Sequence, residues 1–107
     1  MTESEYQKLA DVTFRRLEDA FKDADPDVVD CERAGDVITL TFKSKQRCVV
    51  NTQRPTRQVW LAANARGWHF SYDAAKSAWL DDKGHGEELF ATLQRIVREH
   101  AGVDVAF

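Results

Sequence analysis

Residues 58–62 read QVWLA, a short run of strand-forming residues. Successive side chains of a β-strand point to opposite faces of the sheet, so Val59 and Leu61 should face a core. Trp60 then lies on the opposite face beside Gln58, where no third layer is expected to cover it. An exposed tryptophan among polar residues is typical of a protein-contact anchor. The alternative is that Trp60 packs under a loop or against arginine side chains.

Strand-like runs recur on both sides of this stretch. Together with 58–63, strands are predicted at 28–32, 37–42, 47–51, 68–72 and 78–81, with turn residues between them. The gaps are short, so neighbouring strands should pair antiparallel. One face of the predicted sheet is apolar and should be buried: it carries Ile38, Leu40, Val59, Leu61 and Phe70.

Amphipathic helices are predicted at both ends of the chain. Over 3–23 and over 87–100, apolar residues recur at three- and four-residue spacing. Thr2 with Glu5 has the spacing of a capping box, and Gly102 stands where the second helix should stop. Two such helices can cover the apolar sheet face. The predicted fold class is therefore α+β: one domain over residues 1–107, a two-layer α-β sandwich with both terminal helices on one face of a mainly antiparallel sheet of about six strands.

Composition excludes several classes of protein. With 43% hydrophobic and 31% charged residues, the chain is neither disordered nor fibrous. No apolar run approaches the roughly 18 residues of a membrane helix, and the polar start MTESEYQK does not resemble a secretory signal. Cys31 and Cys48 lie 17 residues apart without CxxC spacing, so reduced strand cysteines are expected rather than a disulfide or a metal pair. These features favour the cytoplasm.

Negative charge is concentrated in one part of the chain. Residues 18–36 hold eight acids against two bases, whereas the remainder holds ten acids against thirteen bases. Such a cluster repels nucleic acid and attracts cations or a basic protein surface. The alternating acids from Asp23 match the start of an EF-hand loop, but Val28 and Ala34 occupy its sixth and twelfth positions, where Gly and Glu are required. An EF-hand is excluded.

Several of these acids oppose the dipole of the first predicted helix. Its last turns include Glu18, Asp19 and Asp23, where each carboxylate costs about 0.3–1 kcal/mol. The pair Asp19 and Asp23 also has the i,i+4 spacing at which like charges repel. A solvated face with ion pairs is the simpler alternative, and Asp11–Arg15 and Glu18–Lys22 have the spacing for it.

Motifs of catalysis are missing from the sequence. GxSxG, GxxxxGK, GxGxxG and HExxH do not occur, and His69, His85 and His100 form no HxxH or HxxxH pair. Carboxylates alone suit hard or borderline cations. A metal held by this cluster should therefore be weakly bound, largely hydrated and poorly discriminated. We expect a binding protein and not an enzyme.

Five segments resemble the bacterial frataxins (the CyaY family), in the same order along the chain. They are SEYQKLAD (4–11), DVVDCE (27–32), VITLTF (37–42), NTQRPTRQVWLA (51–62) and GWHFSYD (67–73). The block QxPxxQVWLA, which begins at Gln53, is the most specific of them.

This resemblance implies a role for the acids and for Trp60. It implies weakly bound iron, Fe²⁺ or Fe³⁺, on a ridge formed by Glu18, Asp19, Asp23, Asp25, Asp27, Asp30 and Glu32. We call these seven residues the acidic ridge. It also implies docking on the cysteine desulfurase and the scaffold protein of iron–sulfur cluster assembly, with Trp60, Asn51 and Gln58 as the outer-face contact. The implied state is a monomer, with iron-dependent oligomers as an alternative.

The sequence departs from the family pattern at three bases. Lys22 stands where the family usually has another acid, so we expect a low iron capacity. Arg54 and Arg57 flank Pro55, where acidic or neutral residues are common, and they should change the charge of the sheet-face contact.

Two other functions can be compared with this one. A double-stranded RNA-binding domain would need lysines before its last helix, but the chain reads GHGEE there (84–88). A pure protein-interaction regulator with incidental metal binding would use the same acids, so the sequence leaves it open.

Overall fold

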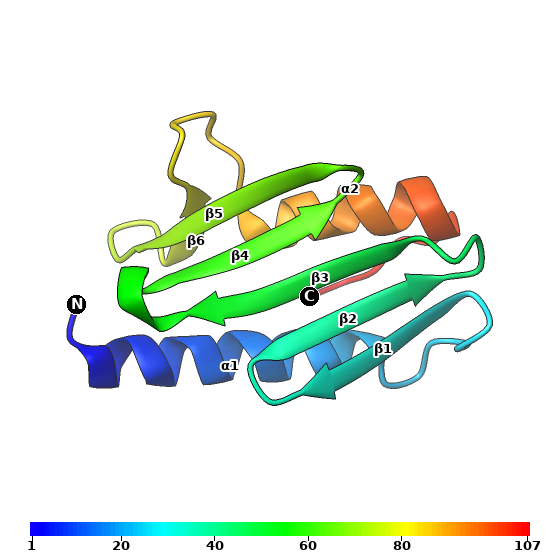
Figure 1. Cartoon of the computed structure of the whole chain (residues 1–107), viewed down its shortest axis with the longest axis horizontal. Coiled ribbons are helices and arrows are strands. Elements are labelled where there is room, and N and C mark those ends of the chain that lie inside the picture. Colours follow the sequence, from blue (N-terminus) through cyan, green and yellow to red (C-terminus); the bar gives the residue numbers. More distant parts are fainter.

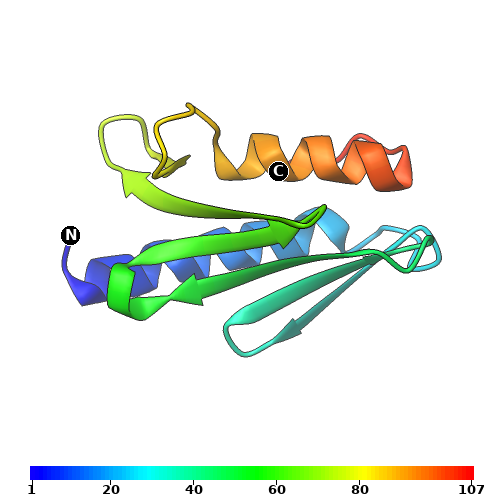
Figure 2. The same cartoon turned by 45° about the horizontal axis from the view of Figure 1, so that its top comes forward.

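Two α-helices lie on one face of a six-stranded sheet in the computed structural model, which describes residues 1–107 (Figures 1 and 2). The strands are adjacent in chain order, and all neighbouring pairs are antiparallel. This architecture confirms the predicted α+β sandwich. The elements are α1 (Glu3–Phe21), β1 (Val29–Ala34), β2 (Val37–Phe42), β3 (Arg47–Gln53), the 3₁₀ turn η1 (Arg54–Thr56), β4 (Gln58–Ala63), β5 (Arg66–Asp73), β6 (Ala78–Asp81) and α2 (Leu89–Ala101).

Short turns set the register of the sheet. β4 and β5 are joined by Asn64 and Ala65, which both have positive φ, as the tightest hairpin turns require. This turn places Trp60 opposite His69. The predicted strands 37–42, 58–63 and 78–81 match the observed bounds, and the other three differ by one or two residues at their ends.

The core fills the space between the sheet and the two helices. The predicted core face is confirmed, because Ile38, Leu40, Val59, Leu61 and Phe70 are each at most 1% exposed. Residues of both helices, including Phe14, Leu17, Leu93 and Ile96, complete the same cluster. Burying one such side chain stabilises the fold by about 1.5–3 kcal/mol.

Helix α1 begins at the predicted capping box but ends two residues before the predicted position. Thr2 Oγ1 accepts from the amide of Glu5 at 3.1 Å, and Glu5 Oε1 accepts from the amide of Thr2 at 3.3 Å. Lys22 is the C-cap, and the amide of Ala24 donates to the carbonyl of Phe21 at 3.1 Å. Asp23 therefore lies outside the helix, and the prediction that it belongs to the last turns of the helix is wrong.

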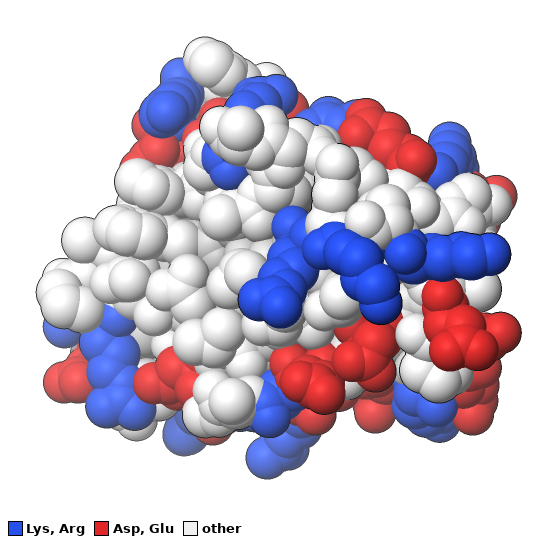
Figure 3. All heavy atoms as spheres, turned by 45° about the vertical axis from the view of Figure 1, so that its right-hand side comes forward, with Lys and Arg blue, Asp and Glu red and all other residues white.

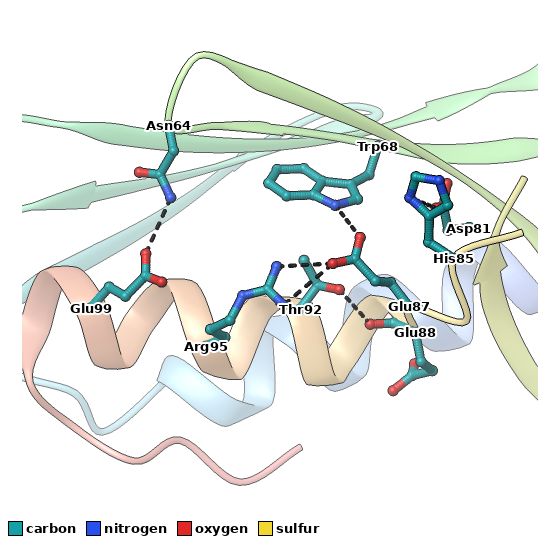
Figure 4. A network of polar contacts seen from close by, with 9 residues as sticks. All are labelled: Asn64, Trp68, Asp81, His85, Glu87, Glu88, Thr92, Arg95 and Glu99. Atoms are coloured by element: carbon teal, nitrogen blue, oxygen red, sulfur yellow. Dashed lines mark hydrogen bonds and ion pairs between the residues drawn. The ribbon is translucent and has the colours of Figure 1, made fainter. Parts of the chain in front are cut away.

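Helix α2 also begins two residues later than predicted. Glu88 is its N-cap, and its carboxylate accepts from the amide of Phe90 at 2.9 Å and from that of Ala91 at 3.1 Å. Glu87 precedes the helix and accepts from Trp68 Nε1 at 2.6 Å and from the Arg95 guanidinium (Figure 4). The predicted start at residue 87 would place both acids in the first turn, and this is wrong, because Glu87 precedes the helix and Glu88 caps it. Glu88 still complements the helix dipole. Gly102 ends the helix with a φ of 67°, as predicted.

The two cysteines are free thiols, as predicted: Cys48 is buried and Cys31 is half-buried. Neither helix is long and apolar enough to cross a membrane.

Candidate functional site

The acidic ridge lies where α1 ends and the edge strand β1 begins. Glu18 and Asp19 belong to the end of α1, where the last turn contains no base. The connection to β1 contributes Asp23, Asp25 and Asp27, and β1 itself contributes Asp30 and Glu32. Figure 3 shows acidic side chains gathered along the lower part of this end of the molecule, directly below a band of basic side chains.

Two ridge acids of the edge strand β1 lie on the sheet face away from the helices. Asp30 and Glu32 alternate with core-facing residues and stand opposite Thr41 and Thr39 on the outer face of the sheet. Asp30 nevertheless lines an exposed hollow together with Glu18 and Asp19. The ridge is therefore a band that follows the sheet edge.

One ridge acid is engaged by a base from the neighbouring strand. Arg33 Nη1 of β1 donates to Glu18 Oε1 at 2.8 Å, and its guanidinium lies 5.2 Å from the centre of the Phe14 ring. The i,i+4 pairs expected for Asp11–Arg15 and Glu18–Lys22 are not formed. Arg33 thus fixes the edge strand to α1, and it neutralises Glu18.

The ridge does not form a metal cage. Nowhere in the chain do three His, Cys, Asp or Glu side chains converge closely enough to hold a metal ion. Cys31 adjoins the ridge, but burial, assisted by the charges of Glu18 and Asp30, raises its pKa to about 11. A protonated thiol is a poor metal ligand. What the ridge offers is exposed carboxylate oxygens, which suit a cation that keeps much of its water.

Trp60 lies on the outer face of the sheet, as predicted, but its side chain is half-buried and not exposed. Its indole stacks on the His69 ring, with centroids 4.1 Å apart and planes inclined by 12°. Its Nε1 donates to Gln58 Oε1 at 2.9 Å, and Asn51 stands directly opposite it on β3. The structure thus brings together the three residues assigned to the outer-face contact. The outer-face residue Thr39 is farther away, because it lies on β2, two strands from β4.

Two further residues complete the surroundings of Trp60. Asp82 accepts from Gln58 Nε2 at 3.0 Å, and its carboxylate lies 3.7 Å from His69 Nδ1. The sequence contains a signal for His69: a two-residue turn at 64–65 places it opposite Trp60. No local signal exists for Asp82, because its place depends on the path of the chain after β6.

Comparison with known proteins decides the family. A family model described as a frataxin-like domain matches residues 1–103. The chain belongs to the frataxin family. Over its whole length it is 40% identical to the iron–sulfur cluster assembly protein CyaY of Delftia acidovorans and 41% identical to that of Pseudomonas aeruginosa, and it covers 97% of each. Frataxin from Psychromonas ingrahamii has the same fold, with a TM-score of 0.87 at 30% identity over 98% of this chain and 96% of that one.

Three bases depart from the family pattern in this chain, and the structure places them in different environments. Lys22 is exposed and forms no ion pair, so it remains a free positive charge among the ridge acids. Arg54 lies 3.9 Å from Asp36, and Arg57 donates to the carbonyl of Met1 at 2.6 Å. Both arginines are thus partly satisfied within the chain. The metal-binding and partner-binding roles of the site residues stay predictions.

Proposed function

We propose that the protein binds iron weakly on the acidic ridge and regulates iron–sulfur cluster assembly by docking on cysteine desulfurase and its scaffold protein. The observation that carries this proposal is the charge of the ridge: of its seven acids, only Glu18 forms an ion pair. Membership of a family whose full-length relatives are named for cluster assembly supplies the context.

Unpaired carboxylates at a sheet edge explain both parts of the proposal. A hydrated ferrous ion can bind to oxygen ligands without a rigid cage, and it can leave again because few protein ligands must be broken. The same charges attract a basic patch on the desulfurase and accelerate its encounter with the protein. Trp60, Asn51 and Gln58 add a second contact with the desulfurase–scaffold assembly. The protein acts through binding, and we assign no catalytic residue.

The test combines metal titration with a cluster-assembly assay. Ferrous iron, added without oxygen, should shift amide NMR signals within residues 18–32, and Mn²⁺ and Ca²⁺ should shift the same signals. The double variant Asp19→Lys/Asp23→Lys should bind metal more weakly and lose its effect on the rate of cluster formation. These losses should be largest at low ionic strength, because exposed charges are screened by salt.

The matched control for each single variant, Asp19→Lys and Asp23→Lys measured alone, is Asp36→Lys, which makes the same charge reversal in the turn between β1 and β2, outside the ridge. It should behave as the wild type. A single tight iron site at His69 or His85 would contradict the proposal, as would a double variant that retains both activities.

A pure interaction regulator is the second candidate. It is favoured by the lack of converging ligands and by the ion pair that engages Glu18. The two candidates differ in their need for metal. If the protein changes the cluster-assembly rate equally with and without prior iron loading, the second candidate is correct.

A further inference from the structure

An apolar groove lies beside the acidic ridge, between the end of α1 and the C-terminal segment. Its volume is about 470 Å³, and eight of its twelve lining residues are hydrophobic. Phe21 and Ala24 line one part of it, and Val103 and Val105 line another. Val103 is 40% exposed, so a large apolar side chain remains in contact with water. Covering such a side chain with an apolar group is favourable.

The C-terminal segment that lines the groove is fixed against the helices. Gln94 Nε2 donates to the carbonyl of Val105 at 3.1 Å, and Arg16 Nη2 donates to that of Phe107 at 2.9 Å. The Phe107 ring packs edge-on against Phe21, with centroids 5.9 Å apart. The groove is therefore formed before a partner arrives, which lowers the entropic cost of binding.

Free negative charge surrounds this apolar surface. Four acids line the groove, and only Asp104 has an ion-pair partner, Arg98 at 2.7 Å. The other three, Asp19, Asp23 and Asp25, belong to the acidic ridge. No lysine or arginine lines the groove. The complementary ligand thus combines an aliphatic group with positive charge.

The shape of this region favours a protein segment over a small molecule. A second hollow, of about 540 Å³, shares Phe21, Ala24 and Val29 with the groove and continues to Asp30 and Cys31 of the edge strand. This second hollow is lined by three acids, Glu18, Asp19 and Asp30, and by one base, Lys22. The surface therefore extends from the C-terminal segment around the end of α1 to β1, and acids outnumber bases along it. A small ligand is usually enclosed by one pocket, whereas an extended surface of this kind is covered by a polypeptide.

We propose that the groove receives a desulfurase segment in which a lysine or arginine stands next to an aliphatic residue. The aliphatic side chain packs between Phe21 and Val103, and the basic side chain pairs with Asp19, Asp23 or Asp25. This inference rests on the proposed function, and it distinguishes the two uses of the ridge. Metal binding needs the carboxylates alone, whereas docking also needs the apolar groove.

Two variants that leave the ridge acids unchanged test the inference. Val103→Thr replaces an exposed methyl group by a hydroxyl, and Ala24→Phe fills the groove. Each should raise the dissociation constant for the desulfurase at least about five-fold, the effect of losing a buried anchor. Mn²⁺ binding, followed by the same NMR signals, should be unchanged. Val12→Thr makes the same chemical change at an exposed valine of α1 that does not line the groove, and it should dock as the wild type.

Three other results would overturn the inference. If Asp23→Lys weakens docking but neither groove variant does, the groove is not used and the proposed function stands. If Asp23→Lys and both groove variants bind the desulfurase as the wild type does, the proposed docking on the ridge is itself wrong. If sedimentation shows a dimer of this chain that Val103→Thr dissociates while desulfurase binding is unchanged, the groove binds a second copy.

Discussion

Cys48 and Cys31 show how their surroundings, burial above all, decide the chemistry of a side chain. Burial raises the pKa of Cys48 to about 12, and burial with the nearby Glu18 and Asp30 raises that of Cys31 to about 11. Both thiols therefore remain protonated at neutral pH. Although Cys31 adjoins the acidic ridge, it supplies neither a thiolate ligand nor a nucleophile.

These raised pKa values predict a loss of stability at alkaline pH. Above about pH 8.5 the unfolded chain releases thiol protons that the native state retains. Because the native state then binds more protons, the free energy of unfolding falls as pH rises, by up to about 1.4 kcal/mol per unit for one fully buried thiol. Urea denaturation under reducing conditions should show a shallower decline for Cys48→Val than for the wild type.

The control for this prediction is Cys31→Val, which should change the slope less because Cys31 is only half-buried. Burial also raises the pKa of the Tyr6 hydroxyl, but Tyr6 is common to all three proteins and does not affect the difference. Parallel pH profiles for the wild type and Cys48→Val would contradict the prediction.

Helix α1 carries acids at both of its ends, with opposite consequences. Glu3 and Glu5 lie in the first turn, where negative charge is favourable, whereas the helix ends near Glu18 and Asp19 with no base in the last turn. A helix selected only for stability would have basic residues there. Glu18 is compensated by its ion pair with Arg33, whereas Asp19 has no such partner.

We predict that replacing an acid by lysine changes the free energy of unfolding in opposite directions at the two ends of α1. Asp19→Lys should raise the free energy of unfolding by about 0.3–1 kcal/mol, and Glu3→Lys should lower it by a similar amount. Urea denaturation at low ionic strength measures both, and high salt should reduce both effects. If Asp19→Lys destabilises the protein, Asp19 has a structural partner that the contacts described above do not include.

Local sequence patterns predict the elements well and their ends less well. Alternation of apolar and polar residues is enough for β2, whereas β4 and β6 are predicted from strand-forming residues between turn residues. The start of α2 could not be predicted from local pattern, since Glu87 is held outside the helix by Trp68, a residue 19 positions earlier. The pair Arg33–Glu18 likewise depends on how β1 packs beside α1. Distant contacts of this kind also decide which ridge acids remain free.

At the scale of the whole molecule, the two layers separate the two candidate contacts. The ridge follows the sheet edge beside α1, whereas Trp60 lies in the fourth of six strands on the face away from the helices. The sequence predicts the members of both surfaces, partly through the family resemblance. It does not predict the groove beside the ridge, because the C-terminal segment reaches that position only by packing against both helices.

Because the two surfaces are separate, we expect mutations on them to change stability and salt-dependent binding in different ways. Trp60→Ala removes the stack on His69, worth about 0.5–1.5 kcal/mol beyond the area that it buries, and the half-buried indole should cost the fold less than a core residue. Leu61→Ala in the core should cost about 2–5 kcal/mol. Trp60→Ala should weaken binding to the desulfurase–scaffold assembly by more than about 1 kcal/mol, with little dependence on salt. Asp19→Lys should weaken the same complex mainly at low salt, because its contribution is charge attraction between exposed groups.

The double variant Trp60→Ala/Asp19→Lys tests whether the surfaces act independently. Residues that share no partner contribute additively within about 0.5 kcal/mol, so the two binding losses should sum. Titration of the assembly with all four proteins, at low and high ionic strength, measures the sum. A larger coupling between the two positions would mean that the layers move together on docking. Unfolding of Trp60→Ala would instead show that Trp60 serves packing, and the outer-face assignment would be wrong.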